Sequence, residues 1–263
     1  MLELYEHSTS VCVIKVRLTL IEKNIPYEGH FIDLRRGGQF DPEYLKIHPG
    51  AVVPALVHNR MIFRESSVIQ YYLEDAFPEP RMMPTNPVCR YRQRLLMKLI
   101  DDPIHPACGL LTQGVAFRKD FSSPEAIAKR MESIPDSRRR DRQRSVFTLG
   151  LDSDFVIDAV RDYQNLLSEM EKSLVDGPWL GGDLYSLADA AATPYVNRLY
   201  MLDIAELFLA SCPKVGDWFD RVRIRHSFNE AITSWYSEDD ADRFLPAEPN
   251  SGKKIAEILR WSI

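Results

Sequence analysis

The first 77 residues alternate short strand patterns with helical ones. Leu2 and Leu4 occupy alternate positions in residues 2–6, which predicts a strand. His7-Ser8-Thr9-Ser10 then supplies turn and cap residues. Apolar residues recur three and four apart in the next segment, which predicts a helix ending near Asn24, before Pro26; they are Val13, Ile14, Val16, Leu18, Leu20, Ile21 and Ile25.

Further short elements complete this pattern. Residues 27–34 predict a second strand, 41–47 a short helix, 55–57 and 61–63 a hairpin turning at Asn59-Arg60, and 68–76 a further helix. The predicted order is β-α-β-α-β-β-α. This is an α/β domain over residues 1–77.

Strand patterns stop at a proline-rich connector, residues 77–87, which predicts a domain boundary. Helical spacing dominates the remainder, residues 88–263. Its clearest seam is formed by Val156, Val160, Tyr163, Leu167, Met170 and Leu174. Residues 115–151 lack a sustained apolar period and include an arginine cluster at 138–144, so we expect an insertion of weak helix and loop there. The second domain is therefore predicted to be all-α.

Composition and charge restrict the possible partners. The 263 residues suffice for two domains, and 45% hydrophobic with 27% charged residues is typical of a globular protein. A net charge of -5 disfavours nucleic acid and anionic membranes as partners. No apolar run reaches the roughly 18 residues of a membrane helix, and the acidic start does not resemble a signal peptide, so we expect a cytoplasmic protein. The four cysteines are spaced too irregularly for a disulfide scaffold or a zinc site, and we expect no metal.

Ser10 lies where the first strand gives way to the first helix. Free backbone N–H groups and the helix dipole favour an anion there, and a serine hydroxyl can donate a hydrogen bond to a neighbouring thiolate. The alternative is that Ser10 is only a helix cap.

Two further segments carry backbone features suited to a peptide ligand. A cis bond before Pro54 would turn the Val53 backbone outward, whereas a trans proline at a strand start is the plain alternative. Glu65 and Ser66 open the next helix, with Ser66 as its cap. They could bind an ammonium group and a carboxylate, or simply begin a helix.

Together these features resemble the glutathione transferase superfamily. The match extends to Gly181-Gly182-Asp183 and to Ser186-Leu187-Ala188-Asp189, a capping box that resembles the family's structural signature. The resemblance implies a thioredoxin-like glutathione-binding domain followed by an all-α substrate domain. It also implies glutathione as co-substrate and a homodimer.

Carried onto this sequence, the resemblance makes Ser10 the hydroxyl that activates the glutathione thiol. Val53, preceding Pro54, would bind the cysteinyl unit through its backbone, and Glu65 and Ser66 would hold the γ-glutamyl head. Gln39 matches a glutamine that contacts glutathione in zeta-class members.

Cys12 bears on the branch of the family. The segment Ser10 to Arg17 resembles the zeta class and the bacterial tetrachlorohydroquinone reductive dehalogenases, in which a cysteine at this place exchanges thiols. This chain has Val11 and Val13 where those groups carry serines. Cys12 would lie in the first turn of the helix, either as a thiol-exchange centre or as a small buried residue.

The resemblance implies an enzyme in which a glutathione thiolate attacks an electrophilic aryl ether, a halogenated compound or a similar hydrophobic substrate, as in the β-etherases. The alternatives are a reductive dehalogenase or thiol-exchange enzyme using Cys12, and a non-catalytic glutathione-binding module. His105, Phe117 and Tyr195 are candidates to approach the substrate, although periodicity places Tyr195 in the core. The arginine cluster fits a solvated surface better than a substrate site.

Overall fold

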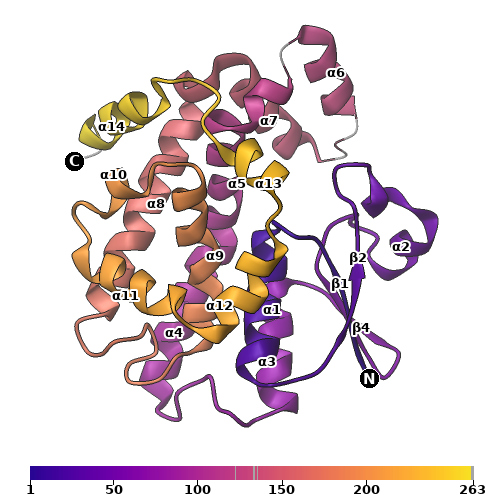
Figure 1. The fold of residues 1–263 in the computed structure, drawn as a ribbon, viewed down its shortest axis with the longest axis vertical. Coiled ribbons are helices and arrows are strands. Elements are labelled where there is room, and N and C mark those ends of the chain that lie inside the picture. Colours follow the sequence, from indigo (N-terminus) through magenta and orange to yellow (C-terminus); the bar gives the residue numbers. More distant parts are fainter. Residues whose placement is uncertain (122, 133, 135, 262–263) are drawn as a thin grey trace. The chain divides into compact units, whose positions relative to one another are not determined.

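The computed structural model describes residues 1–121, 123–132, 134 and 136–261, and it divides into two compact units. Unit 1 comprises residues 1–97, 176–194 and 218–236, and unit 2 comprises 98–175, 195–217 and 237–263. Figure 1 shows the ribbon.

Unit 1 contains the sheet. Its elements, including those it shares with unit 2, are β1 (Leu2–Glu6), α1 (Val11–Glu22), β2 (Glu28–Phe31), η1 (Gly38–Phe40), α2 (Pro42–Ile47), β3 (Ala55–His58), β4 (Met61–Phe63), α3 (Ser66–Ala76), α4 (Pro87–Leu99), α9 (Leu187–Met201), α11 (Pro213–Arg223), α12 (His226–Ala231) and η5 (Thr233–Trp235). The predicted order of strands and helices over the first 76 residues is confirmed, with the short η1 added.

The strands are ordered β2-β1-β3-β4, with β1 and β2 parallel and the other pairs antiparallel. Because side chains alternate along a strand, Leu2 and Leu4 of β1 face α1 and α3, while Tyr5 faces the opposite side and packs against Tyr44 of α2. Figure 1 shows α2 on the other side of the sheet from α1 and α3. The hairpin turns at Asn59-Arg60, as predicted, and the structure gives both residues a positive φ.

The second predicted strand is shorter than residues 27–34. β2 ends at Phe31, and the side chain of Asp33 then accepts hydrogen bonds from the backbone N–H groups of Arg35 and Arg36. This local turn competes with strand pairing and ends the strand.

Unit 2 is helical. Besides its parts of α4, α9 and α11, it contains η2 (Ile100–Ile104), α5 (His105–Val115), η3 (Phe117–Asp120), α6 (Pro124–Glu132), α7 (Ser137–Leu149), η4 (Gly150–Asp152), α8 (Asp154–Ser173), α10 (Ala205–Leu209), α13 (Glu238–Phe244) and α14 (Ser251–Trp261). The predicted seam from Val156 to Met170 is buried along α8, and α5 packs alongside that helix.

The segment 115–151 is more helical than expected. It contains both α6 and α7, and α7 runs for 13 residues. Asp136 caps α7 by accepting a hydrogen bond from the Arg139 N–H at 2.6 Å. Arginine has a high helix propensity, so a helix forms although its first turns have no apolar period. The prediction of weak helix and loop was wrong here.

Candidate functional site

Ser10 is the N-cap of α1. Its φ is -72°, and its Oγ accepts a hydrogen bond from the Val13 N–H at 3.4 Å. A hydroxyl that accepts this bond keeps its own hydrogen for donation to another group. The cap predicted from the sequence is therefore present, in a geometry that leaves Ser10 able to donate. Cys12 follows in the first turn of α1 and is partly exposed.

The turn that carries Ser10 is held by Arg17, a residue to which the sequence analysis gave no role. Arg17 is fully buried; its Nε donates to Glu6 Oε2 at 2.8 Å and its Nη2 to the His7 carbonyl at 3.1 Å. Burial raises the pKa of Glu6 and the arginine charge opposes that shift. The sequence did contain a signal for this role, because Arg17 is a charged residue on the face of α1 that becomes buried.

The guanidinium also ties a distant segment to α1. Nη1 donates to the Ala231 carbonyl at 2.8 Å, and the Trp235 ring lies 3.6 Å from Arg17 Cζ. Residues at both ends of unit 1's sequence thus support the Ser10 turn.

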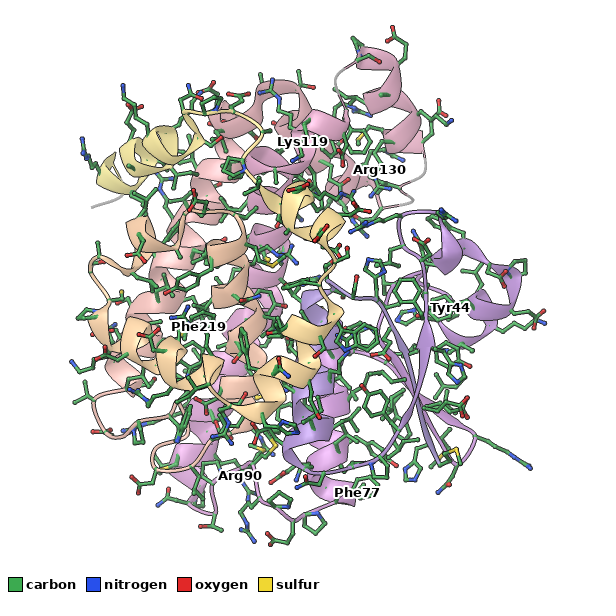
Figure 2. The ribbon with its side chains drawn as sticks, viewed as in Figure 1. Tyr44, Phe77, Arg90, Lys119, Arg130 and Phe219 are labelled. Atoms are coloured by element: carbon green, nitrogen blue, oxygen red, sulfur yellow. The ribbon has the colours of Figure 1, made fainter. Side chains whose placement is uncertain are left out.

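Val53 and Pro54 are joined by a cis peptide bond, the geometry that the sequence left open. The Val53 side chain is buried against Val13 of α1 and Tyr44 of α2. Tyr44, labelled in Figure 2, donates its hydroxyl to the Val52 carbonyl at 2.6 Å. The structure therefore brings the Val53 segment next to the first turn of α1.

Glu65 and Ser66 do not have the arrangement expected from sequence. Ser66 is the first residue of α3, and Glu65 occupies the N-cap position with φ of 67° and no side-chain cap bond. Ser66 was therefore wrong as the cap. Its buried position still presents a helix N-terminus, while Glu65 is exposed. A non-glycine residue at such a φ is strained, a feature concentrated at functional sites.

Lys15 connects α1 to the start of α3. Its Nζ donates to Ser67 Oγ at 2.6 Å, and its side chain is fully buried. Arg64, just before Glu65, donates its Nε to the Ile47 carbonyl at 2.8 Å. These bonds bring the start of α3 close to α1 and to the segment that leads to Val53.

Gln39 lies on η1, and its buried Oε1 accepts no hydrogen bond from the described part of the chain. No recorded hydrogen bond among the described residues joins it to the other predicted site residues.

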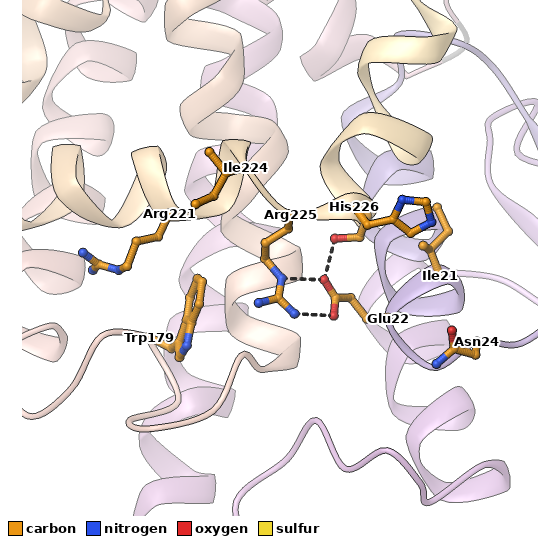
Figure 3. Close-up of a pocket in the computed structure, with 9 residues that line it drawn as sticks. Ile21, Glu22, Asn24, Trp179, Arg221, Ile224, Arg225 and His226 are labelled. Atoms are coloured by element: carbon orange, nitrogen blue, oxygen red, sulfur yellow. Dashed lines mark hydrogen bonds and ion pairs between the residues drawn. The ribbon is translucent and has the colours of Figure 1, made fainter.

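A cavity of about 600 Å³ lies elsewhere in unit 1 and contains none of these residues. Figure 3 shows its centre, where Arg225 binds both carboxylate oxygens of Glu22 at 2.7 Å. The hydrogen bond to Glu22 raises the pKa of Arg225. Arg225 also stacks on Trp179 and Tyr185. These contacts join the end of α1 to the start of α12. The charged and aromatic side chains at this cavity therefore have a structural role.

Two of the substrate candidates meet in unit 2. His105 Nδ1 lies 3.2 Å from the hydroxyl of Tyr195, which is fully buried as its periodicity predicted. Phe117 packs against Phe244 instead. Most of the arginines at 138–144 are exposed on α7, in agreement with a solvated surface.

The segment before α9 forms the predicted structural signature. Asp189 is fully buried and accepts hydrogen bonds from the N–H of Ser186 at 2.8 Å and from its hydroxyl at 2.6 Å. It also accepts from the Leu180 N–H and from Trp218 Nε1, both at 2.8 Å. Burial raises the pKa of Asp189, and these bonds oppose the shift.

Two family models match the chain. Residues 4–81 match the glutathione S-transferase N-terminal domain and residues 156–225 match its C-terminal domain, more than half of the chain together. The chain belongs to the glutathione transferase superfamily. The expected fold, a thioredoxin-like domain followed by a helical domain, is thereby confirmed, and glutathione is the co-substrate of the enzymes in this family.

Relatives come from several branches of this superfamily. The crystal structure of Beta-etherase LigF from a Sphingobium strain has a TM-score of 0.75 and 25% identity, covering 88% of this chain and 98% of that one. Tetrachloro-P-hydroquinone reductive dehalogenase from Sphingobium chlorophenolicum is 26% identical over 87% of this chain and 94% of that protein. Glutathione S-transferase zeta class from Euphorbia esula is 40% identical over 85 residues, 32% of this chain. The chain spans 38% of the length of this relative and of three other plant glutathione S-transferases that it matches.

Among the described residues, no group of three or more His, Cys, Asp or Glu side chains could hold a metal ion. No helix in the same part of the chain is long and apolar enough to cross a membrane.

Proposed function

We propose that this protein is a glutathione transferase in which Ser10 stabilises the thiolate of bound glutathione. The observation that carries the proposal is the position of Ser10 Oγ at the N-terminus of α1, bonded to the Val13 N–H. The helix dipole and the Ser10 hydroxyl would both favour the ionised sulfur, and each unit taken off its pKa is worth about 1.4 kcal/mol. Under this proposal, residues 1–77 form the glutathione-binding domain and residues 88–263 form the substrate domain.

The remaining predicted residues would hold the rest of the tripeptide. The Val53 backbone, next to Pro54, would bind the cysteinyl unit, and the α3 N-terminus at Ser66 would bind the γ-glutamyl carboxylate. Glu65 is exposed and could pair with the ammonium group of the same head. Gln39 would contact glutathione from η1.

The reaction would be a nucleophilic substitution at carbon. The thiol proton leaves to solvent, the sulfur forms a bond to the electrophilic carbon, and the halide or aryloxide departs with the electron pair of the broken bond. The similarity to LigF, described as a beta-etherase, and to a reductive dehalogenase supports an aryl ether or halogenated aromatic substrate of the kind met in bacterial aromatic catabolism. Such a reaction suits a cytoplasm that supplies glutathione.

The test compares the thiol pKa of bound glutathione in Ser10→Ala and in the parent, followed by thiolate absorbance against pH. We expect the pKa to rise in Ser10→Ala. Ser237→Ala removes another helix cap, that of α13, and should leave the thiol pKa unchanged. An unchanged pKa in Ser10→Ala would refute the role of Ser10, and turnover of a general aryl halide separates an enzyme from a glutathione-binding module.

Cys12 supports a second candidate, thiol exchange. It is partly exposed in the first turn of α1, close in sequence to Ser10. Its thiolate would attack one sulfur of oxidised glutathione, giving a mixed disulfide on Cys12 and releasing one glutathione thiolate. Mass spectrometry should then find the adduct on Cys12 ahead of Cys89, the exposed cysteine that serves as a control. Modification of Cys89 alone would exclude this reaction.

A homodimer is the proposed assembly. Val88, Tyr91 and Leu95 on α4 are 58%, 63% and 55% exposed, and their spacing places them on one face of the helix. Arg94 of α4 lies over the Tyr71 ring of α3, where Val68 is 56% exposed. Exposed apolar side chains gathered on neighbouring helices suit a second copy of the chain.

A further inference from the structure

The Tyr44 hydroxyl donates a hydrogen bond to the backbone carbonyl of Val52, next to the proposed glutathione site. Only 3% of Tyr44 is exposed. The centroid of its ring lies 5.7 Å from that of Tyr5 and 6.5 Å from that of His48. Figure 2 shows Tyr44 beside the strands of unit 1. The packed ring fixes its hydroxyl, which donates to the Val52 carbonyl at 2.6 Å.

The carbonyl of Val52 and the N–H of Val53 belong to the same peptide group. The cis bond in this segment is the next one, Val53-Pro54, and the Val52-Val53 bond is trans. In a trans peptide the C=O and N–H point in opposite directions. Because Tyr44 holds the carbonyl on the buried side, the Val53 N–H points away from Tyr44.

The Val53 N–H has no recorded acceptor among the described residues. We propose that Tyr44 is a positioning residue for glutathione, which fixes the Val52-Val53 peptide so that the Val53 N–H receives the cysteinyl carbonyl. This inference rests on the proposed function, since it requires glutathione to bind at Val53. It adds a residue of α2 that does not itself touch the ligand.

The hydroxyl also strengthens the donor that it orients. Burial raises the pKa of Tyr44 well above its ordinary value, so the phenol stays protonated and donates at every pH of interest. A hydrogen bond accepted by a peptide carbonyl polarises the group and makes its N–H a better donor. Orientation and polarisation therefore act in the same direction on glutathione affinity.

Tyr44→Phe removes only the hydroxyl and keeps the packed ring. We expect glutathione to bind about fivefold more weakly, which corresponds to about 1 kcal/mol for one hydrogen bond. The KM for glutathione should rise by the same factor, whereas kcat at saturating glutathione should change less than twofold, by roughly 0.4 kcal/mol at most.

Tyr72→Phe is the matched control. The Tyr72 hydroxyl is bonded to His58 Nδ1 at 2.5 Å in the same unit, so this variant also loses one hydroxyl hydrogen bond. Both variants should lose similar thermal stability, but Tyr72→Phe should bind glutathione as the parent does. Equal weakening in the two variants would overturn the proposal, because it would reflect general destabilisation.

The amide signal of Val53 in nuclear magnetic resonance tests the position directly. In the parent, glutathione should shift this signal and slow its hydrogen exchange, and both effects should shrink in Tyr44→Phe. Parent-like effects and affinity in Tyr44→Phe would overturn the role of Tyr44 while leaving the proposed function intact. If the parent itself bound no glutathione, the proposed function would fail and this inference with it.

Discussion

Replacing Asp189 by alanine should destabilise unit 1 severely. The carboxylate accepts four hydrogen bonds from groups far apart in sequence: the N–H and hydroxyl of Ser186, the Leu180 N–H and Trp218 Nε1. Asp189 is fully buried, so its removal leaves these donors without an acceptor and without water. The alanine methyl group fills none of the lost volume around them.

The size of the effect follows from the number of stranded donors. A hydrogen bond to a charged group contributes about 1.5–3 kcal/mol, and breaking a buried charged network usually costs about 3–5 kcal/mol because the losses are not additive. We therefore expect a loss of about 4 kcal/mol in the free energy of unfolding. Asp189→Asn keeps an acceptor oxygen for Leu180 and Trp218 but turns amide hydrogens toward Ser186, so about half of that loss is expected.

Urea unfolding followed by tryptophan fluorescence measures this loss. The control is Asp183→Ala, an exposed aspartate in the same segment, which should change stability by less than about 0.5 kcal/mol. Equal midpoints for Asp189→Ala and Asp183→Ala would refute the reasoning. So would an Asp189→Asn variant less stable than Asp189→Ala.

Two further predictions concern alkaline stability and assembly. Burial, reinforced by the charge of Glu6, raises the pKa of Tyr27 from 10.0 to about 12. The neutral phenol therefore favours the folded state below pH 10.0, and this contribution is lost as the pH rises through about 12. Melting temperatures should fall over that range, and the fall should be shallower in Tyr27→Phe. Parallel curves for Tyr27→Phe and the parent would contradict this prediction. The second prediction concerns the dimer: Tyr91→Arg should convert it to monomer in analytical ultracentrifugation, whereas Arg92→Ala, also on α4, should not; a monomeric parent would refute the dimer.

Local sequence patterns predicted much of the fold. The alternation of Leu2 and Leu4, the turn at Asn59-Arg60 and the seam of α8 each depend on neighbours within a few residues. Such features can be predicted because strand alternation, helical spacing and turn conformation are local properties of the chain. Where the pattern was weak, as in the arginine-rich start of α7, the prediction failed.

Local sequence patterns predicted only part of the candidate site. Ser10 as a cap follows from its place between a strand and a helix. The features at Val53, Glu65 and Ser66 were also visible in the sequence, and the resemblance gave them glutathione contacts and added Gln39. The start of α3 shows the limit, since the positive φ of Glu65 moves the helix start to Ser66 itself. A backbone angle of this kind has no reliable signal in the residue type.

The amino-acid sequence by itself determined the order of the elements in the first domain, the apolar faces that bury them and the position of Ser10. Tertiary structure alone decided how the site is supported. Arg17 joins Glu6 and His7 to Ala231, and Tyr44 meets the Val52 carbonyl only because α2 packs against the sheet. Hydrogen bonds between segments separated in sequence depend on packing geometry, which no local spacing of residues encodes.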